Sequence, residues 1–187
     1  MHSPFGPISA ALCTSGRHYV GRMPLTVIDQ PADRPEWIRE TIRLVADRTG
    51  AERAALLARV ESASDADLGS GTDSDWGLGQ IAVHLLVVER GVAALALRLA
   101  RGEAGGPTGQ PRPAAAEVSR EGILALGAKA AAAQERLLAE FPADPDDGAT
   151  AVHPFYGRLN CFGWLLTLPN HYTAHLTALR EGRGSAL

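Results

Sequence analysis

Residues 80–88 read Gln-Ile-Ala-Val-His-Leu-Leu-Val-Val, an apolar run with a single histidine, His84, at its centre. Apolar residues continue at three- and four-residue steps to Leu99, which predicts a helix from about residue 76 or 78 to residue 101. His84 falls on the inward face of that helix. A buried imidazole needs partners for its ring nitrogens, so His84 is either a metal ligand or a core histidine bonded to a backbone carbonyl.

Three further segments carry helical periodicity and are separated by stretches rich in Gly, Pro, Ser and Asp. They run from about residue 36 to 61, from 115 to 141 and from 159 to 182. The segments 62–75 and 142–158 read as loops. The stretch 102–113 is long for a tight hairpin, so it is expected to carry the chain from one end of a bundle to the other. The predicted fold is all-α, a four-helix bundle with long crossover connections.

A second histidine signal lies near the C-terminus, where residues 170–175 read Asn-His-Tyr-Thr-Ala-His. Residues four apart share one face of a helix, so His171 and His175 would present two imidazoles to one point. This spacing also arises by chance on amphipathic helices. Three histidines that leave one position open are typical of catalytic zinc and similar ions. His84 is the best candidate for the third nitrogen.

Three other side chains lie near these histidines in the pattern and bear on the site. His153 precedes a proline, which favours extended backbone, and it either lines a site entrance or lies on plain surface. Glu89 lies about 140° around its helix from His84 on a regular helix, which favours a solvated or bridging carboxylate that points elsewhere. Cys161 lies about three turns before His171 and is expected to be a small packing residue.

The N-terminal segment shows no lasting periodicity. We expect residues 1–23 to form a poorly ordered extension and residues 24–187 to form the bundle domain. His2, His18 and Cys13 lie in this extension, so a metal role for either histidine is not expected. Met23 offers a second candidate start for the natural chain.

Composition and net charge exclude some classes of binding partner. The chain has 187 residues, a formal net charge of −3 and a pI of about 6.1, so neither nucleic acid nor an anionic membrane surface is an expected partner. No apolar run approaches the roughly 18 residues needed to span a bilayer, and no secretion signal is visible. We expect a cytoplasmic protein whose two cysteines are reduced.

Four features follow one another along the chain: Trp76 to His84, then Glu89, then the His-Pro-Phe-Tyr-Gly turn that starts at His153, then the histidine pair at 171 and 175. Together they resemble the DinB/YfiT-like superfamily of metal-binding four-helix bundles, the damage-inducible bundle proteins. The resemblance covers about residues 35–179. It implies that His84, His171 and His175 hold a divalent metal ion such as zinc or nickel.

Two departures from the family pattern are visible. Gly77 replaces the usual serine, which weakens the cap of the helix that carries His84. Tyr172 stands where an aspartate often follows the first histidine of the pair, so an outer-shell hydrogen bond could be missing. His153 and Tyr172 therefore remain candidates for an outer-shell or entrance role, and no catalytic side chain is assigned.

The resemblance implies two enzyme functions, and the sequence leaves a third, non-catalytic one open. The first is transfer of a low-molecular-weight thiol, of the bacillithiol or mycothiol class, to an electrophilic small molecule, with the ion holding the thiolate. The second is a hydrolase that uses metal-bound hydroxide, although no carboxylate is predicted on the ligand faces. The third is a metal-binding stress protein without turnover. Relatives commonly dimerise, so a homodimer is a further expectation.

Overall fold

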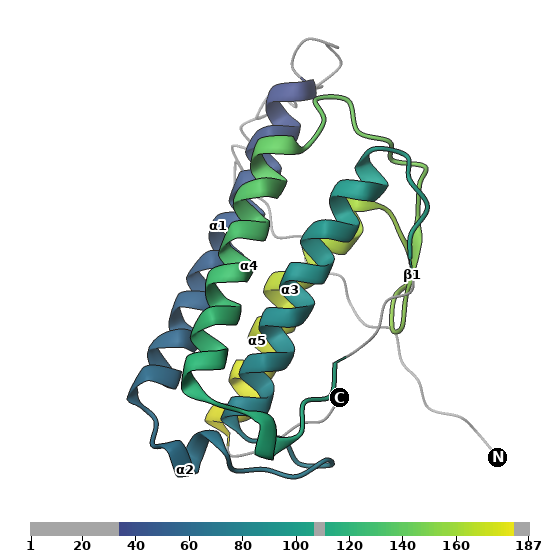
Figure 1. Ribbon diagram of the computed structural model, residues 1–187. Helices are drawn as coiled ribbons and strands as arrows, with labels where there is room; N and C mark the ends of the chain where they lie inside the picture. Colours follow the sequence, from purple (N-terminus) through teal and green to yellow (C-terminus); the bar gives the residue numbers. More distant parts are fainter. Residues whose placement is uncertain (1–33, 107–110, 182–187) are drawn as a thin grey trace, which may run out of the picture.

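The computed structural model describes residues 34–106 and 111–181. Four long helices make the body of the molecule: α1 (Arg34–Ser62), α3 (Leu78–Ala100), α4 (Arg120–Glu140) and α5 (Cys161–Arg180). Each of α1 and α3 packs against both α4 and α5, which closes a four-helix bundle (Figure 1). The all-α prediction is therefore confirmed. The expected extension, with His2, His18, Cys13 and the choice between Met1 and Met23, lies outside the described residues.

The direction of the helices reveals one crossover. In Figure 1, α3 and α4 run parallel, because the chain leaves the end of α3 and returns along the bundle before α4 begins. Segment 101–119 makes this connection, and the crossover predicted for 102–113 lies within it. The connections from α1 to α3 and from α4 to α5 each begin and end at the same end of the bundle, and the second includes a hairpin that extends back along its side. Only one of the long crossovers that the sequence suggested is thus present in the described chain.

Short elements occupy both segments that were predicted to be loops. Helix α2 (Asp65–Leu68) begins after Ser64, whose side chain accepts the Asp67 N–H, while the Asp67 carboxylate accepts the Ser64 N–H. Strands β1 (Ala151–His153) and β2 (Gly157–Leu159) form an antiparallel hairpin. Elements of three or four residues are too short to show a periodicity, so the prediction of plain loop was wrong here.

The start of α4 was also predicted too early. A single 3₁₀ turn, η1 (Ala115–Glu117), precedes it, and Ser119 then caps the helix by accepting the Gly122 N–H. The predicted helix from residue 115 therefore divides in two. A serine side chain that satisfies a free N–H at a helix start is the signal that would have placed this boundary correctly.

Gly77, at the start of α3, is explained by close packing. A Cβ atom at this position would lie 2.1 Å from the Ser70 carbonyl oxygen, so a serine would not fit. The helix has no capping side chain at Gly77. Instead, the Gln80 Oε1 atom accepts the Gly77 N–H at 3.1 Å, and the Gln80 amide donates to the carbonyls of Thr72 and Pro113. Gln80 thus ties the start of α3 to two loops.

The core consists of two apolar clusters stacked along the bundle. One contains Ile42 and Trp164, and the other contains Leu56 and Leu86. Buried polar side chains from all four long helices lie in the bundle interior as well: Thr49, Gln80, His84, Glu89, Gln134 and His175. Two members of this set, His84 and His175, belong to the candidate functional site together with the half-buried His171.

Helix α3 is long and apolar enough to cross a membrane by length and composition, which the sequence analysis did not anticipate. However, 67% of its most apolar window is buried inside the bundle. Burial by α4 and α5 accounts for this apolar character, as in the core helix of a globular protein. Because α3 is enclosed on most of its faces, polar side chains on several of these faces are surrounded by protein.

Candidate metal centre

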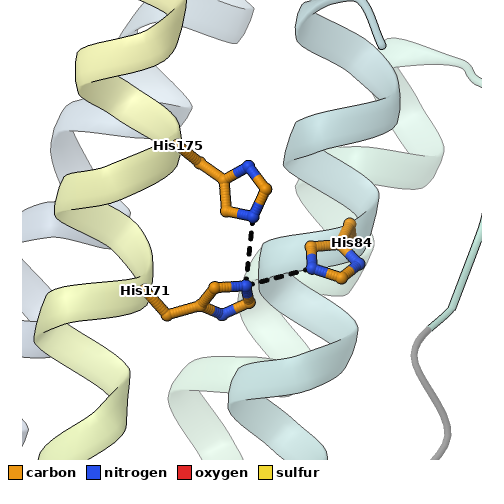
Figure 2. Close-up of side chains that lie close together, drawn as sticks. All are labelled: His84, His171 and His175. Atoms are coloured by element: carbon orange, nitrogen blue, oxygen red, sulfur yellow. Dashed lines mark hydrogen bonds between the residues drawn. The ribbon is translucent and has the colours of Figure 1, made fainter. Parts of the chain in front are cut away.

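Three imidazoles converge between α3 and α5. Figure 2 shows His84 from α3 and His171 and His175 from α5 pointing toward one another. The Nε2 atom of His171 lies 3.1 Å from Nε2 of His84 and 3.1 Å from Nε2 of His175. All three candidate ligand atoms lie within 4.8 Å of one another. The structure therefore brings together the three histidines that the sequence singled out.

This spacing suits a shared cation. Nitrogens about 2.0–2.1 Å from a tetrahedral zinc ion lie roughly 3.3–3.4 Å apart, close to the two separations between Nε2 atoms. The His171 and His175 side chains reach one point because they stand one helical turn apart on α5. A divalent ion on these three nitrogens would have one position left for a fourth ligand.

The ring orientation of His84 is fixed by a backbone carbonyl. Its Nδ1 atom lies 2.9 Å from the Pro111 carbonyl oxygen. A carbonyl only accepts hydrogen bonds, so Nδ1 carries the proton and Nε2 presents its lone pair to the other two rings. A carbonyl that holds the distal nitrogen of a ligand is the usual outer-shell arrangement in metal sites. The sequence left two alternatives for His84, a backbone carbonyl or a metal site. The geometry is compatible with both, because each uses a different ring nitrogen.

The electrostatics favour neutral rings. Burial, followed by the charges that His175, His84 and His153 would carry, lowers the pKa of His171 to about 3. Burial also lowers the pKa of His175 to about 4 and lowers the pKa of His84. All three rings are thus neutral at neutral pH, the state in which imidazole binds metals.

The ring nitrogens of the three histidines do not all have hydrogen-bond partners. His175 Nδ1 is buried and has no hydrogen-bond partner among the described residues. With Nε2 of His84 unprotonated, the His171 Nε2 atom would have to donate a proton to His84 and also pair with His175. A ring nitrogen carries either one proton or one lone pair, so both contacts cannot be hydrogen bonds. Buried polar atoms left in this state are rare in proteins. A cation shared by the three Nε2 atoms removes the conflict among these atoms, although His175 Nδ1 keeps its proton without an acceptor in the described chain. The three converging nitrogens therefore fit a divalent metal ion.

A cavity of about 410 Å³ lies beside the triad and is lined in part by His84 and His171. It runs between α3 and α5 and is bordered by the β1–β2 hairpin. Its other walls are mostly apolar and include Val88, Val92, Leu95, Phe155, Tyr156 and Trp164, and the arginines Arg90 and Arg98 line it as well. Among the described residues that line it, none is an aspartate or a glutamate.

His153 lies at the end of β1 and lines this cavity. Of the two alternatives from the sequence, this position agrees with the site entrance and not with plain surface. Tyr172 does not. Its side chain is fully buried, and its hydroxyl donates to Glu89 Oε2 at 2.6 Å. An entrance role for Tyr172 is therefore wrong, and its hydroxyl is not bonded to a triad imidazole.

Glu89 is buried rather than solvated. Its side chain is 0% exposed and forms an ion pair with Arg53 of α1, while its other oxygen accepts the Tyr172 hydroxyl. Burial raises the pKa of Glu89, and the hydrogen bond from Tyr172 and the charge of Arg53 oppose that shift. The bridging alternative is thus correct and the solvated one is wrong. Helical phase could not separate them, because α3 is enclosed on most of its faces.

Cys161 is fully buried in the apolar cluster that contains Trp164, as expected for a packing residue. Burial raises the pKa of the Cys161 thiol to about 11. It is therefore protonated at neutral pH and enclosed by protein, which makes it a poor nucleophile.

Sequence reasoning missed three contributors. Pro111 supplies the carbonyl that orients His84, but a backbone carbonyl leaves no mark in a sequence. Arg53 lies on the inward face of α1. A charged residue on such a face indicates a buried ion pair, and the sequence offered this signal. Trp164 falls on the buried face of α5, but its position in the cavity wall depends on the β1–β2 hairpin, which the sequence did not predict.

Comparison with known proteins gives a fold relative. No family model matches the chain, and no curated protein matches it. A solved structure described as TT2238, a four-helix bundle protein, is 32% identical and superposes with a TM-score of 0.58. The alignment covers 75% of this chain and 98% of TT2238. That description names a fold and no DinB or YfiT relationship, so the finer resemblance stays a prediction. At this identity and coverage, the chain belongs to the same family of four-helix bundle proteins as TT2238.

Proposed function

We propose that this protein is a metal-dependent enzyme that transfers a low-molecular-weight thiol, of the bacillithiol or mycothiol class, to an electrophilic small molecule. One observation carries the proposal: three neutral imidazoles converge at the wall of a mostly apolar cavity of about 410 Å³. His84, His171 and His175 would hold the ion. When bound, a divalent cation such as zinc or nickel would favour the thiolate form of a thiol near neutral pH.

The chain contributes position and exclusion of water. The Pro111 carbonyl holds the His84 ring in the orientation that turns Nε2 toward the other two nitrogens. Apolar side chains of α3 and α5 line the cavity, so an electrophile can lie against them beside the triad. The reaction forms a carbon–sulfur bond with an electron pair of the sulfur, and a leaving group or a carbonyl oxygen takes the displaced pair.

The sulfur must come from outside the described chain. Cys161 is buried, and its pKa is raised to about 11, so it cannot serve as the nucleophile. It lies at the first turn of α5, whereas His171 lies about three turns further along the helix. An external thiol is therefore the simplest source.

A hydrolase is the weaker candidate. Hydrolysis needs a base to take the proton of the attacking water, and the described cavity lining offers no carboxylate. Tyr172 is buried on Glu89, and burial together with that neighbouring carboxylate raises the pKa of Tyr172. The Nδ1 atom of His153 is occupied by two backbone N–H groups, so it is not free to act as a base.

Metal-dependent conjugation is the decisive measurement. Untagged protein is analysed for metal, loaded with zinc or nickel, and tested with bacillithiol, mycothiol, glutathione and cysteine against monochlorobimane. We expect conjugation with one thiol, its loss on chelation and its return on adding metal. The same preparations are screened for esterase and amidase activity.

A matched pair of variants links activity to the site. His84→Ala should lose both the metal and conjugation, whereas Cys161→Ser should keep both if it folds. Metal at full occupancy without conjugation by any thiol would reject the transferase and leave the non-catalytic metal-binding role. Unchanged metal content in His84→Ala would reject the site itself.

A further inference from the structure

His153 presents a hydrogen-bond donor at the cavity. Its Nδ1 atom accepts the backbone N–H groups of Phe155 at 3.1 Å and Tyr156 at 3.4 Å. A ring nitrogen that accepts carries no proton, so the neutral ring carries its proton on Nε2. Burial lowers the pKa of His153, which favours that neutral ring. Within residues 34–106 and 111–181, the Nε2–H group has no acceptor.

A second donor without an acceptor lies next to it. The Trp164 side chain is 3% exposed, and its indole Nε1–H has no hydrogen-bond partner in the described part of the chain. The rings of His153 and Trp164 are in contact, with centroids 4.8 Å apart. Both residues line the cavity that His84 and His171 also line. A buried N–H without a partner costs roughly 1–3 kcal/mol, so the indole N–H of Trp164, beside the half-buried His153 donor in the same cavity wall, calls for a ligand.

We propose that the Nε2–H of His153 and the indole N–H of Trp164 bind an oxygen atom of the electrophile. The cavity then selects small, mostly apolar molecules with a carbonyl oxygen conjugated to the reacting carbon. The apolar walls support this class, because the described lining holds no carboxylate that would repel an oxygen with growing negative charge. This assignment rests on the proposed thiol transfer for its chemistry.

The reaction balances for an α,β-unsaturated ketone. The thiol releases its proton to solvent, and the sulfur electron pair forms the new bond at the β-carbon. The carbon–carbon π pair moves toward the carbonyl, whose oxygen gains negative charge beside the two N–H donors. A proton from solvent then adds to the α-carbon, so the product is the thioether ketone. Donors placed where charge develops lower the barrier.

Binding is tested without turnover. The metal-loaded protein, labelled with ¹⁵N, is titrated with 4-phenylbutan-2-one, a saturated ketone that cannot react by conjugate addition. Butylbenzene, with the same carbon skeleton and no oxygen, is the control. We expect downfield shifts of the Trp164 indole and His153 Nε2–H signals with the ketone alone. Trp164→Phe identifies the indole signal, or triple-resonance assignment does so if that variant fails to fold.

Kinetics test the same donors. In His153→Asn the side-chain oxygen can still accept the N–H groups of Phe155 and Tyr156, but the distal donor is gone. We expect conjugation of trans-4-phenyl-3-buten-2-one to fall by about 10- to 100-fold, and that of benzyl chloride to change by less than about two-fold. His153→Gln, which returns an N–H near the Nε2 position, should recover part of the loss.

The two proposals fail in different ways. If wild-type protein conjugates neither electrophile, the thiol transfer is rejected, and the ketone titration alone decides whether the two donors bind oxygen. Equal losses for both electrophiles in His153→Asn would overturn the donor assignment. A proton on His153 Nδ1, or signals that move equally with ketone and hydrocarbon, would overturn it as well.

Discussion

Two clusters of polar side chains lie inside this bundle, and they differ in whether their hydrogen-bonding atoms have partners. Arg53, Glu89 and Tyr172 form a closed set, in which a cation and a hydroxyl donor meet the two oxygens of one carboxylate. His84, His171 and His175 bring three imidazoles together, and the His171 Nε2 atom lies within hydrogen-bond distance of two other ring nitrogens although it can pair with only one of them. The first set is complete as it stands, whereas the second needs an ion. The balance of donors and acceptors therefore separates a structural group from a ligand site better than burial does.

The largest expected effect comes from breaking the closed set. Glu89→Ala would leave the Arg53 charge, only 15% exposed, without its partner, so the free energy of unfolding should fall by about 3–5 kcal/mol. Urea denaturation of metal-free protein measures this. Arg43→Ala, which breaks an exposed pair with Glu40 on the same helix, is the control and should cost less than about 1 kcal/mol. Equal effects would mean that the Glu89 pair is not a buried one.

Removing a triad histidine should mainly weaken metal binding, whereas breaking the closed set mainly lowers the free energy of unfolding. His171→Ala should weaken zinc binding by more than the roughly 100-fold typical of losing an outer-shell partner, because a direct ligand is lost. Calorimetric titration of untagged protein, with a competing chelator, measures the affinity. His153→Asn lies at the same cavity and should keep the wild-type affinity. A similar loss in both variants would argue that the cavity, and not the triad, determines binding.

Tyr172→Phe sharpens the comparison, because Tyr172 adjoins His171 in sequence but belongs to the closed set. Loss of its hydrogen bond to the buried carboxylate should lower the free energy of unfolding by about 1–3 kcal/mol. Zinc affinity should change by less than about three-fold, well below the effect of an outer-shell partner. Both quantities come from the urea and calorimetric measurements above. A large drop in affinity would show that the two sets act as one.

The last test leaves every side chain in place and varies the pH of the metal-free protein. His171 and His175 have folded-state pKa values of about 3 and about 4, below the ordinary value of 6.5. Between those values the unfolded chain binds protons that the folded chain does not, so stability is complete above about pH 6.5 and falls as the pH drops. Urea midpoints at pH 7, 6 and 5 should decrease in that order. A His171→Gln, His175→Gln double variant should show a flatter profile, and an equal slope would contradict the assignment.

Sequence predicted the long helices and the meeting of His84 with His171 and His175, because helical phase is strong over twenty or more residues. It failed where the decisive contact is not periodic. Helix α2 and the β1–β2 hairpin are too short for a pattern, and Glu89 lies on a helix that is enclosed on most faces. The role of Pro111 rests on its backbone carbonyl, and the position of Trp164 in the cavity wall rests on the hairpin. Such relationships exist only once the chain is folded.

The segment that joins α3 to α4 limits how the length of this chain can vary. Pro111 has to reach the level of His84, which lies about 24 Å back along α3 from Ala100. Residues 101–110 could extend about 33 Å, so deletion of two or three residues there leaves enough reach. A deletion much longer than that would draw the carbonyl away from the imidazole. Natural length variants of this segment should therefore be tolerated up to that limit, beyond which the site loses its orientation before the bundle loses its fold.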